Sequence, residues 1–137
     1  IDYLPYPINY GFIPQTILSK RVGGDGDTLD IIVIGPQINR GSIVKVKVIG
    51  MIEILDEGEL DTKILSVLIK DGLKISEVNS LSDLKENYIG ALEIILIWFE
   101  NYKGKKLKVK NILGKRRSME EIKLRHNDFL SEIKNKN

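Results

Sequence analysis

Apolar and polar positions divide the chain into a first half patterned as strands and a second half patterned mainly as helices. Residues 29–34 form a nearly continuous apolar run rich in β-branched residues, which predicts a buried strand. Residues 42–55 partly alternate apolar residues with lysine, so they predict a strand with one wet face. Residues 62–69 predict the next strand. The turn-forming residues 56–59 lie between these two predicted strands, so the pattern predicts a β-hairpin.

Helical spacing of apolar residues begins after Ser80, which forms a capping box with Asp83, and it continues to a glycine at position 104. Residues 107–112 return to alternation and predict a further strand. Ser118, followed by Glu121, is a second capping box, and it predicts the start of a C-terminal amphipathic helix.

The predicted elements amount to one α+β domain over residues 1–137. Residues 1–16 hold three of the four prolines, and we expect them to be extended or turning. The pattern favours a small antiparallel, barrel-like sheet followed by two helices that flank a strand.

Composition narrows the chemistry that this domain can carry. Cysteine is absent and His126 is the only histidine, which excludes disulfides, thiol nucleophiles and multi-histidine metal sites. No apolar run is long enough for a membrane span, and no secretory leader pattern is present. We therefore expect a cytoplasmic protein with no membrane partner.

The net charge of +2 hides an asymmetry, because residues 103–137 hold 12 basic and 4 acidic side chains. Such a basic tail can bind nucleic acid, or it can form a solvated helix or an internal partner for the acidic part. The helical spacing of its apolar residues favours the second interpretation.

Two acidic clusters adjoin predicted strands, and they comprise Asp25, Asp27 and Asp30, and then Asp56, Glu57, Glu59 and Asp61. Acidic surface loops are common, so the residues alone leave a solvated loop and a metal site equally open. If the clusters converge, their oxygen ligands suit magnesium or manganese and not zinc. An extended backbone would place Asp25 and Asp27 on one face, and likewise Asp61 and Lys63.

Several other side chains could donate hydrogen bonds to an anion, namely Tyr6, Tyr10, Lys63, Tyr102 and Lys103. Tyrosines near prolines also serve as packing residues, and lysine is favoured at a helix C-terminus by the helix dipole. We expect His126, Trp98 and Phe99 to be core or boundary residues.

Four segments resemble the motifs of soluble family I inorganic pyrophosphatases, in the same order. Residues 6–16 (YPINYGFIPQT) are similar to YPxNYGxIPxT, and residues 24–30 (GDGDTLD) to the DxDPxD metal signature. Residues 56–63 (DEGELDTK) are similar to DEGExDxK, and residues 98–103 (WFENYK) to WFxxYK. Thr28 stands where that family usually has proline.

The resemblance implies a five-stranded, OB-like β-barrel with two flanking α-helices, and hydrolysis of pyrophosphate, bound as its magnesium complex. Mg²⁺ is the implied cofactor, with Mn²⁺ or another hard divalent ion possible. A homo-oligomer is implied too, a hexamer or a dimer. The implied metal ligands are Asp25, Asp30, Asp61, Asp56 and Glu57, the general base is Asp27, and the phosphate-binding residues are Tyr10, Lys63, Tyr102 and Lys103, supported by Tyr6.

In that family the YPxNYG segment follows several dozen residues that supply barrel strands and an active-site Glu, Lys and Arg. We therefore expect the natural protein to be longer than this chain. A catalytically impaired relative that binds metal and phosphate is the first alternative. The second alternative is an OB-like nucleic-acid binder. Such a protein uses stacking aromatic residues on its strands, and the predicted strands of this chain offer almost none.

Overall fold

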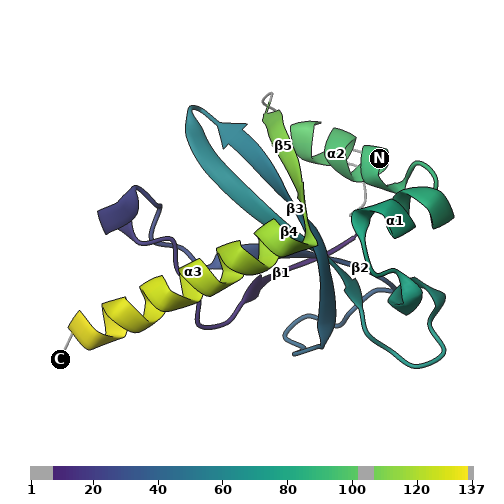
Figure 1. The fold of residues 1–137 in the computed structure, drawn as a ribbon, viewed down its shortest axis with the longest axis horizontal. Coiled ribbons are helices and arrows are strands. Elements are labelled where there is room, and N and C mark those ends of the chain that lie inside the picture. The colour runs from purple at the N-terminus through teal and green to yellow at the C-terminus, as the bar shows by residue number, and fades with distance from the viewer. Residues whose placement is uncertain (1–7, 102–106, 136–137) are drawn as a thin grey trace.

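The computed structural model describes residues 8–101 and 107–135, which form a mainly β domain built on one sheet (Figure 1). Its elements, in chain order, are β1 (Asn9–Ile13), the 3-10 helix η1 (Lys20–Val22), β2 (Leu29–Ile34), β3 (Val46–Asp56), β4 (Glu59–Leu68), the 3-10 helix η2 (Lys74–Glu77), α1 (Leu81–Asn87), α2 (Ala91–Asn101), β5 (Lys108–Gly114) and α3 (Lys115–Asn135). No helix in these ranges combines the length and hydrophobicity that a membrane span requires.

The sheet has five strands in the order β1-β2-β4-β3-β5. The prediction of a mainly β, OB-like domain is confirmed. The expectation of a wholly antiparallel sheet is wrong, because β2 and β4 pair in parallel. Apolar patterning sets which face of a strand is buried but not which distant strand lies beside it, so the partners of β2 were not readable from the pattern.

The predicted hairpin is formed by β3 and β4. Glu57 and Gly58 both have positive φ, 53° and 85°, as a tight two-residue hairpin turn requires. β3 begins at Val46, four residues later than predicted. Its partner β4 ends at Leu68, and the last backbone hydrogen bond between the two segments runs from the Ile69 N–H to the Lys45 carbonyl, so residues 42–44 have no partner strand among the described residues.

The helical half differs from prediction at two places. Ser80 caps α1 as expected and accepts from the Asp83 N–H at 3.1 Å, but the helix ends before Gly90, whose φ of 86° separates α1 from α2. The second capping box is wrong: α3 begins at Lys115, and the Ser118 hydroxyl lies inside its first turn, where it donates to the Gly114 carbonyl at 2.7 Å.

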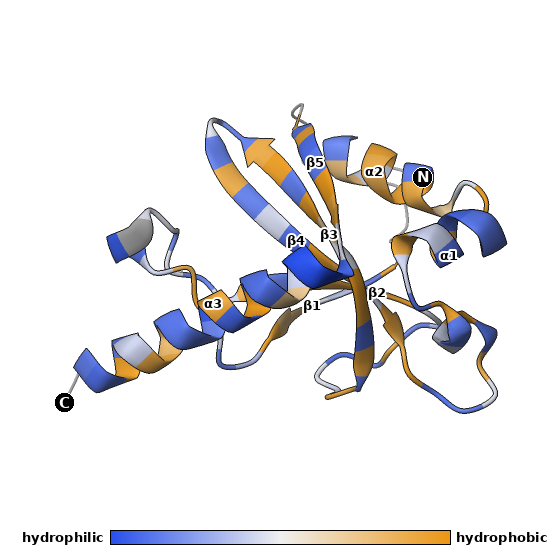
Figure 2. Ribbon diagram, viewed as in Figure 1, coloured by the Kyte–Doolittle hydropathy of each residue, from blue (hydrophilic) through white to orange (hydrophobic). Residues whose placement is uncertain are grey.

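Side chains alternate between the two faces of the sheet, and each face has its own core. One cluster joins Ile52 and Leu65 to the apolar face of α2, where Phe99 is fully buried. The other joins Met51 and Ile64 to Ile122 of α3. Figure 2 shows apolar residues along α2, which lies beside β5. The expectation that Trp98 and Phe99 are core residues is confirmed, and their rings meet edge to face at 5.0 Å.

Candidate functional site

Three polar side chains share the face of the sheet that α2 covers. Asp30 of β2 lies opposite Lys63 of β4 in the parallel register, so both project from the same face. Asp61 precedes Lys63 by two residues on β4 and therefore shares that face, as the sequence predicts. Strand pairing thus gathers residues from the two acidic clusters at one place.

Lys63 lies between the two carboxylates. Its Nζ donates to Asp30 Oδ2 at 2.7 Å and forms an ion pair with Asp61 Oδ2 at 2.8 Å, and the residue is only 3% exposed. Burial opposes the charged form, but the hydrogen bonds to Asp30 and Asp61 outweigh it, and the pKa of Lys63 is raised well above its usual range. The ammonium is therefore permanently charged at neutral pH.

Tyr10 of β1 completes this cluster. The Lys63 ammonium lies 5.3 Å from the centre of the Tyr10 ring, and the phenol hydrogen-bonds with both Lys63 and Asp30. Burial against neighbours such as Phe99, at 6.2 Å between ring centres, raises the pKa of the Tyr10 phenol well above its usual range. Tyr10 therefore remains a hydrogen-bond donor at neutral and mildly alkaline pH.

The raised pKa of Lys63 predicts how the metal-free protein responds to alkali. Above pH about 10.5 the unfolded chain loses this proton while the folded protein keeps it, so the free energy of unfolding falls by about 1.4 kcal/mol per pH unit from this group. Urea unfolding at a series of pH values measures the slope. Lys63→Met should remove the contribution of Lys63 to this slope, whereas Lys45→Met, at an exposed site, should keep it. Equal slopes in the wild type and both variants would show that the pKa of Lys63 is ordinary.

Asp25 and Asp27 lie in an exposed loop before β2. The loop is not extended, because Gly26 has a φ of 82° and Asp25 Oδ1 accepts from the Asp27 N–H at 2.9 Å. The extended backbone that would set the two side chains on one face is therefore not present here. Within residues 8–101 and 107–135, no three acidic or histidine side chains stand close enough to hold a metal together.

The remaining predicted residues fall into two groups. Asp56 ends β3 and Glu57 forms the hairpin turn, on the strand pair that also carries Asp61. The residues Tyr6, Tyr102 and Lys103 lie outside the described residues.

Sequence reasoning missed two side chains that hold the strands bearing the site. Thr16, 3% exposed, donates to the Ile13 carbonyl at 2.6 Å and accepts from the Leu29 N–H at 3.0 Å. Asn9 donates to the Pro36 carbonyl at 2.9 Å and accepts from the Ile38 N–H at 2.9 Å. Both lie in the first motif, residues 6–16, and the signal available there was a polar residue among prolines and apolar residues.

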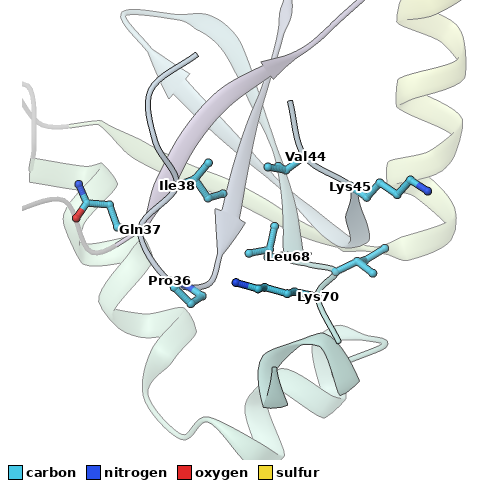
Figure 3. A pocket seen from close by; sticks show the side chains of 8 residues that line it. Pro36, Gln37, Ile38, Val44, Lys45, Leu68 and Lys70 are labelled. Atoms are coloured by element: carbon cyan, nitrogen blue, oxygen red, sulfur yellow. The ribbon is translucent and has the colours of Figure 1, made fainter. Parts of the chain in front are cut away.

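A groove of about 410 Å³ lies at the opposite ends of β2 and β4 (Figure 3). Its walls are mostly aliphatic and include Pro36, Ile38 and Leu68, and the Lys70 side chain reaches across toward Pro36. None of the predicted site residues lines it, so the groove and the Lys63 cluster are separate features.

The profile of the family described as inorganic pyrophosphatase matches residues 1–130. The chain belongs to the inorganic pyrophosphatase family. It is 42% identical over 124 residues to the inorganic pyrophosphatase of Nanoarchaeum equitans, covering 86% of this chain and 72% of that protein. It is 39% identical over 114 residues to the inorganic pyrophosphatase of Encephalitozoon cuniculi, covering 77% of this chain and 41% of that protein.

Solved pyrophosphatase structures share the fold. The type I inorganic pyrophosphatase of Plasmodium falciparum superposes with a TM-score of 0.81 at 34% identity, over 90% of this chain and 45% of that one. An N-terminally truncated vacuolar soluble pyrophosphatase of Trypanosoma cruzi, solved in complex with PPi, gives 0.84 at 30% identity, over 93% and 53%. The chain spans 41% of the Encephalitozoon cuniculi protein, 31% of the Drosophila melanogaster relative and 32% of the Plasmodium falciparum relative, so it corresponds to part of these pyrophosphatases.

Proposed function

We propose that this chain supplies the catalytic face of a metal-dependent enzyme that hydrolyses inorganic pyrophosphate to two phosphates. The observation that carries the proposal is the convergence of Asp30, Asp61 and Tyr10 on the buried Lys63. All four lie in the family's own motifs. The Trypanosoma cruzi relative, solved with PPi, supports pyrophosphate as the substrate.

The donor atoms suit a hard divalent cation. Two carboxylates from adjacent strands already approach one cationic group, the Lys63 ammonium, to 2.7 and 2.8 Å. Carboxylate oxygens are the ligands that Mg²⁺ and Mn²⁺ prefer. We therefore assign Asp30 and Asp61 to the metal, with Asp25 as their partner from the neighbouring loop and Asp56 and Glu57 toward a further ion. The bound metal would supply Lewis-acid polarisation of the phosphoryl oxygens and of water.

The chain's own residues supply the remaining chemistry. Asp27 accepts the proton of the attacking water as general base, a role open to a carboxylate exposed to solvent beside the metal ligands. Lys63 and Tyr10 donate to the phosphates, as do Tyr102 and Lys103, and Tyr6 supports this pocket. Because these donors carry positive charge or an N–H or O–H group, they stabilise negative charge that grows on the leaving phosphate.

The partners follow from this chemistry. We propose that pyrophosphate binds as its magnesium complex and that nucleic acid and membranes are not partners. We also propose a cytoplasmic, homo-oligomeric protein, a hexamer or a dimer. Ile94 and Ile97, exposed on α2, support the oligomer. Light scattering tests this, and a monomeric mass would contradict it.

Phosphate release tests the proposed function. Purified protein should release phosphate from pyrophosphate when Mg²⁺ or Mn²⁺ is present and release none with chelator. It should leave a simple phosphate monoester intact. A protein that binds magnesium pyrophosphate in calorimetry without releasing phosphate would instead be the impaired, binding-only relative. Metal-independent release would contradict the assignment of the carboxylates.

A further inference from the structure

The C-terminal half of α3 is fastened to the segment that follows β1 (Figure 1). The Ile17 N–H donates to the Arg125 carbonyl at 3.2 Å, and His126 Nδ1 lies 2.8 Å from the Gln15 carbonyl oxygen. These bonds join residues more than a hundred positions apart in the chain. The basic tail is therefore an internal partner of the first half rather than a separate appendage.

The strongest of these contacts is a hydrogen bond between a buried hydroxyl and a carboxylate. Ser19 is 2% exposed, and its Oγ donates to Glu132 Oε1 at 2.6 Å. The same hydroxyl accepts from the Arg21 N–H at 3.3 Å, and the Arg21 guanidinium lies 3.6 Å from Glu132. Hydrogen bonds to a charged group are stronger than neutral ones, and leaving one partner buried without the other is costly.

The segment held by Glu132 in turn holds the acidic loop. The Leu18 N–H donates to the Asp27 carbonyl at 2.9 Å, and the Gly26 N–H donates to the Leu18 carbonyl at 2.7 Å. The Gly24 N–H donates to the Ser19 carbonyl at 2.9 Å. A Cβ at Gly24 would overlap the Leu18 backbone, so the two segments of the loop at residues 18 and 24 are in direct contact. Leu18 and Ser19 thus lie between α3 and the carboxylates of Asp25 and Asp27.

We propose that Ser19 and Glu132 are positioning residues, through which α3 fixes the loop that presents Asp25 and Asp27. The inference builds on the proposed function, because it gives those carboxylates their roles toward metal and water. Asp25 and Asp27 are exposed, so contacts on the far side of the loop must define their position. Displacement of a reacting group by about 1 Å can cost about a hundredfold in rate.

The test compares Ser19→Ala, Glu132→Ala and their double variant with Glu120→Ala, which breaks only an exposed ion pair with Arg117 on the same helix. The primary readout is the dissociation constant for Mn²⁺, measured by electron paramagnetic resonance of the free ion without substrate. Each single variant should weaken Mn²⁺ binding about tenfold, the effect of one charge-assisted hydrogen bond. The double variant should weaken Mn²⁺ binding by less than the product of the two single effects, because the bond between Ser19 and Glu132 can be lost only once.

Two further readouts separate positioning from general support of the fold. Glu132→Gln retains an oxygen that can accept from Ser19, so it should restore most of the Mn²⁺ affinity. In steady-state hydrolysis at saturating Mg²⁺, Ser19→Ala and Glu132→Ala should lower kcat about tenfold and leave KM for magnesium pyrophosphate within about twofold, because the loop is assigned the base and a metal ligand but none of the phosphate donors. Glu120→Ala should match the wild type in every assay.

The outcomes distinguish this inference from the proposed function. If Ser19→Ala and Glu132→Ala unfold at lower urea concentration but bind Mn²⁺ like the wild type, the pair is structural only and the inference is overturned. If the wild type binds Mn²⁺ without releasing phosphate, the proposed function fails while the Mn²⁺ comparison still decides this inference. A wild type that binds no Mn²⁺ would overturn both.

Discussion

Replacement of Asp27 by asparagine is expected to reduce phosphate release from pyrophosphate by about 10²- to 10⁴-fold, the range that a positioned general base contributes. Asparagine cannot accept the proton, although it keeps nearly the same shape. The Asp27 carbonyl accepts from the Leu18 N–H, and the Asp27 N–H donates to Asp25 Oδ1. Neither hydrogen bond depends on the charge of the Asp27 side chain. The loop should therefore persist in the variant.

Two controls make the Asp27 result specific. Asp71→Asn removes an equally exposed carboxylate outside the acidic clusters and should leave phosphate release unchanged. Asp25→Asn should weaken Mn²⁺ binding, whereas Asp27→Asn should leave it within about threefold, since a base need not be a ligand. An Asp27→Asn protein with wild-type kcat would remove Asp27 from the reaction.

Replacement of Lys63 by methionine is expected to lower the free energy of unfolding by about 3 kcal/mol in the metal-free protein, since it leaves two carboxylates facing each other without their cation. The loss falls at the lower end for broken buried pairs, because the Asp30 and Asp61 side chains are 32% and 28% exposed and retain some water. Removing one donor to the phosphates should also reduce kcat by about a hundredfold.

Added metal should distinguish the two parts of the Lys63 effect. Mg²⁺ or Mn²⁺ should raise the midpoint of thermal unfolding more in Lys63→Met than in the wild type, because the ion relieves the repulsion between Asp30 and Asp61. The matched control is Lys70→Met, at an exposed site, which should show the wild-type response. Equal metal-induced shifts in all three proteins would mean that the ion does not bind these carboxylates.

The parts of the fold that depend on local pattern were readable from the sequence. The strand predicted over residues 62–69 is present, and the two-residue period of an extended backbone correctly set Asp61 and Lys63 on one face. The residues of the tight turn marked the hairpin at Glu57 and Gly58. Ser80 capped its helix as expected. Each of these features depends on neighbours within a few residues along the chain, which is why pattern alone suffices.

The parts that depend on distant partners were not readable. The ion pair of Asp30 with Lys63 exists because β2 and β4 pair in parallel, and nothing local encodes that neighbour. The bond of Ser19 to Glu132 joins positions 113 residues apart. Ser118 fits a capping box by sequence, yet α3 starts earlier because the chain passes directly from β5 into the helix at Lys115. Identification of the acidic clusters as a site came from motif resemblance rather than from pattern.

The central claim is that the face of the sheet around Lys63 binds the divalent metal and pyrophosphate. Anomalous diffraction from crystals of the protein grown with Mn²⁺ and a non-hydrolysable pyrophosphate analogue tests it most directly. The account predicts a manganese peak within coordination distance of Asp30 and Asp61, with the analogue beside Lys63 and Tyr10. Manganese bound only elsewhere, with the Lys63 ammonium still held between both carboxylates beside an empty site, would contradict it.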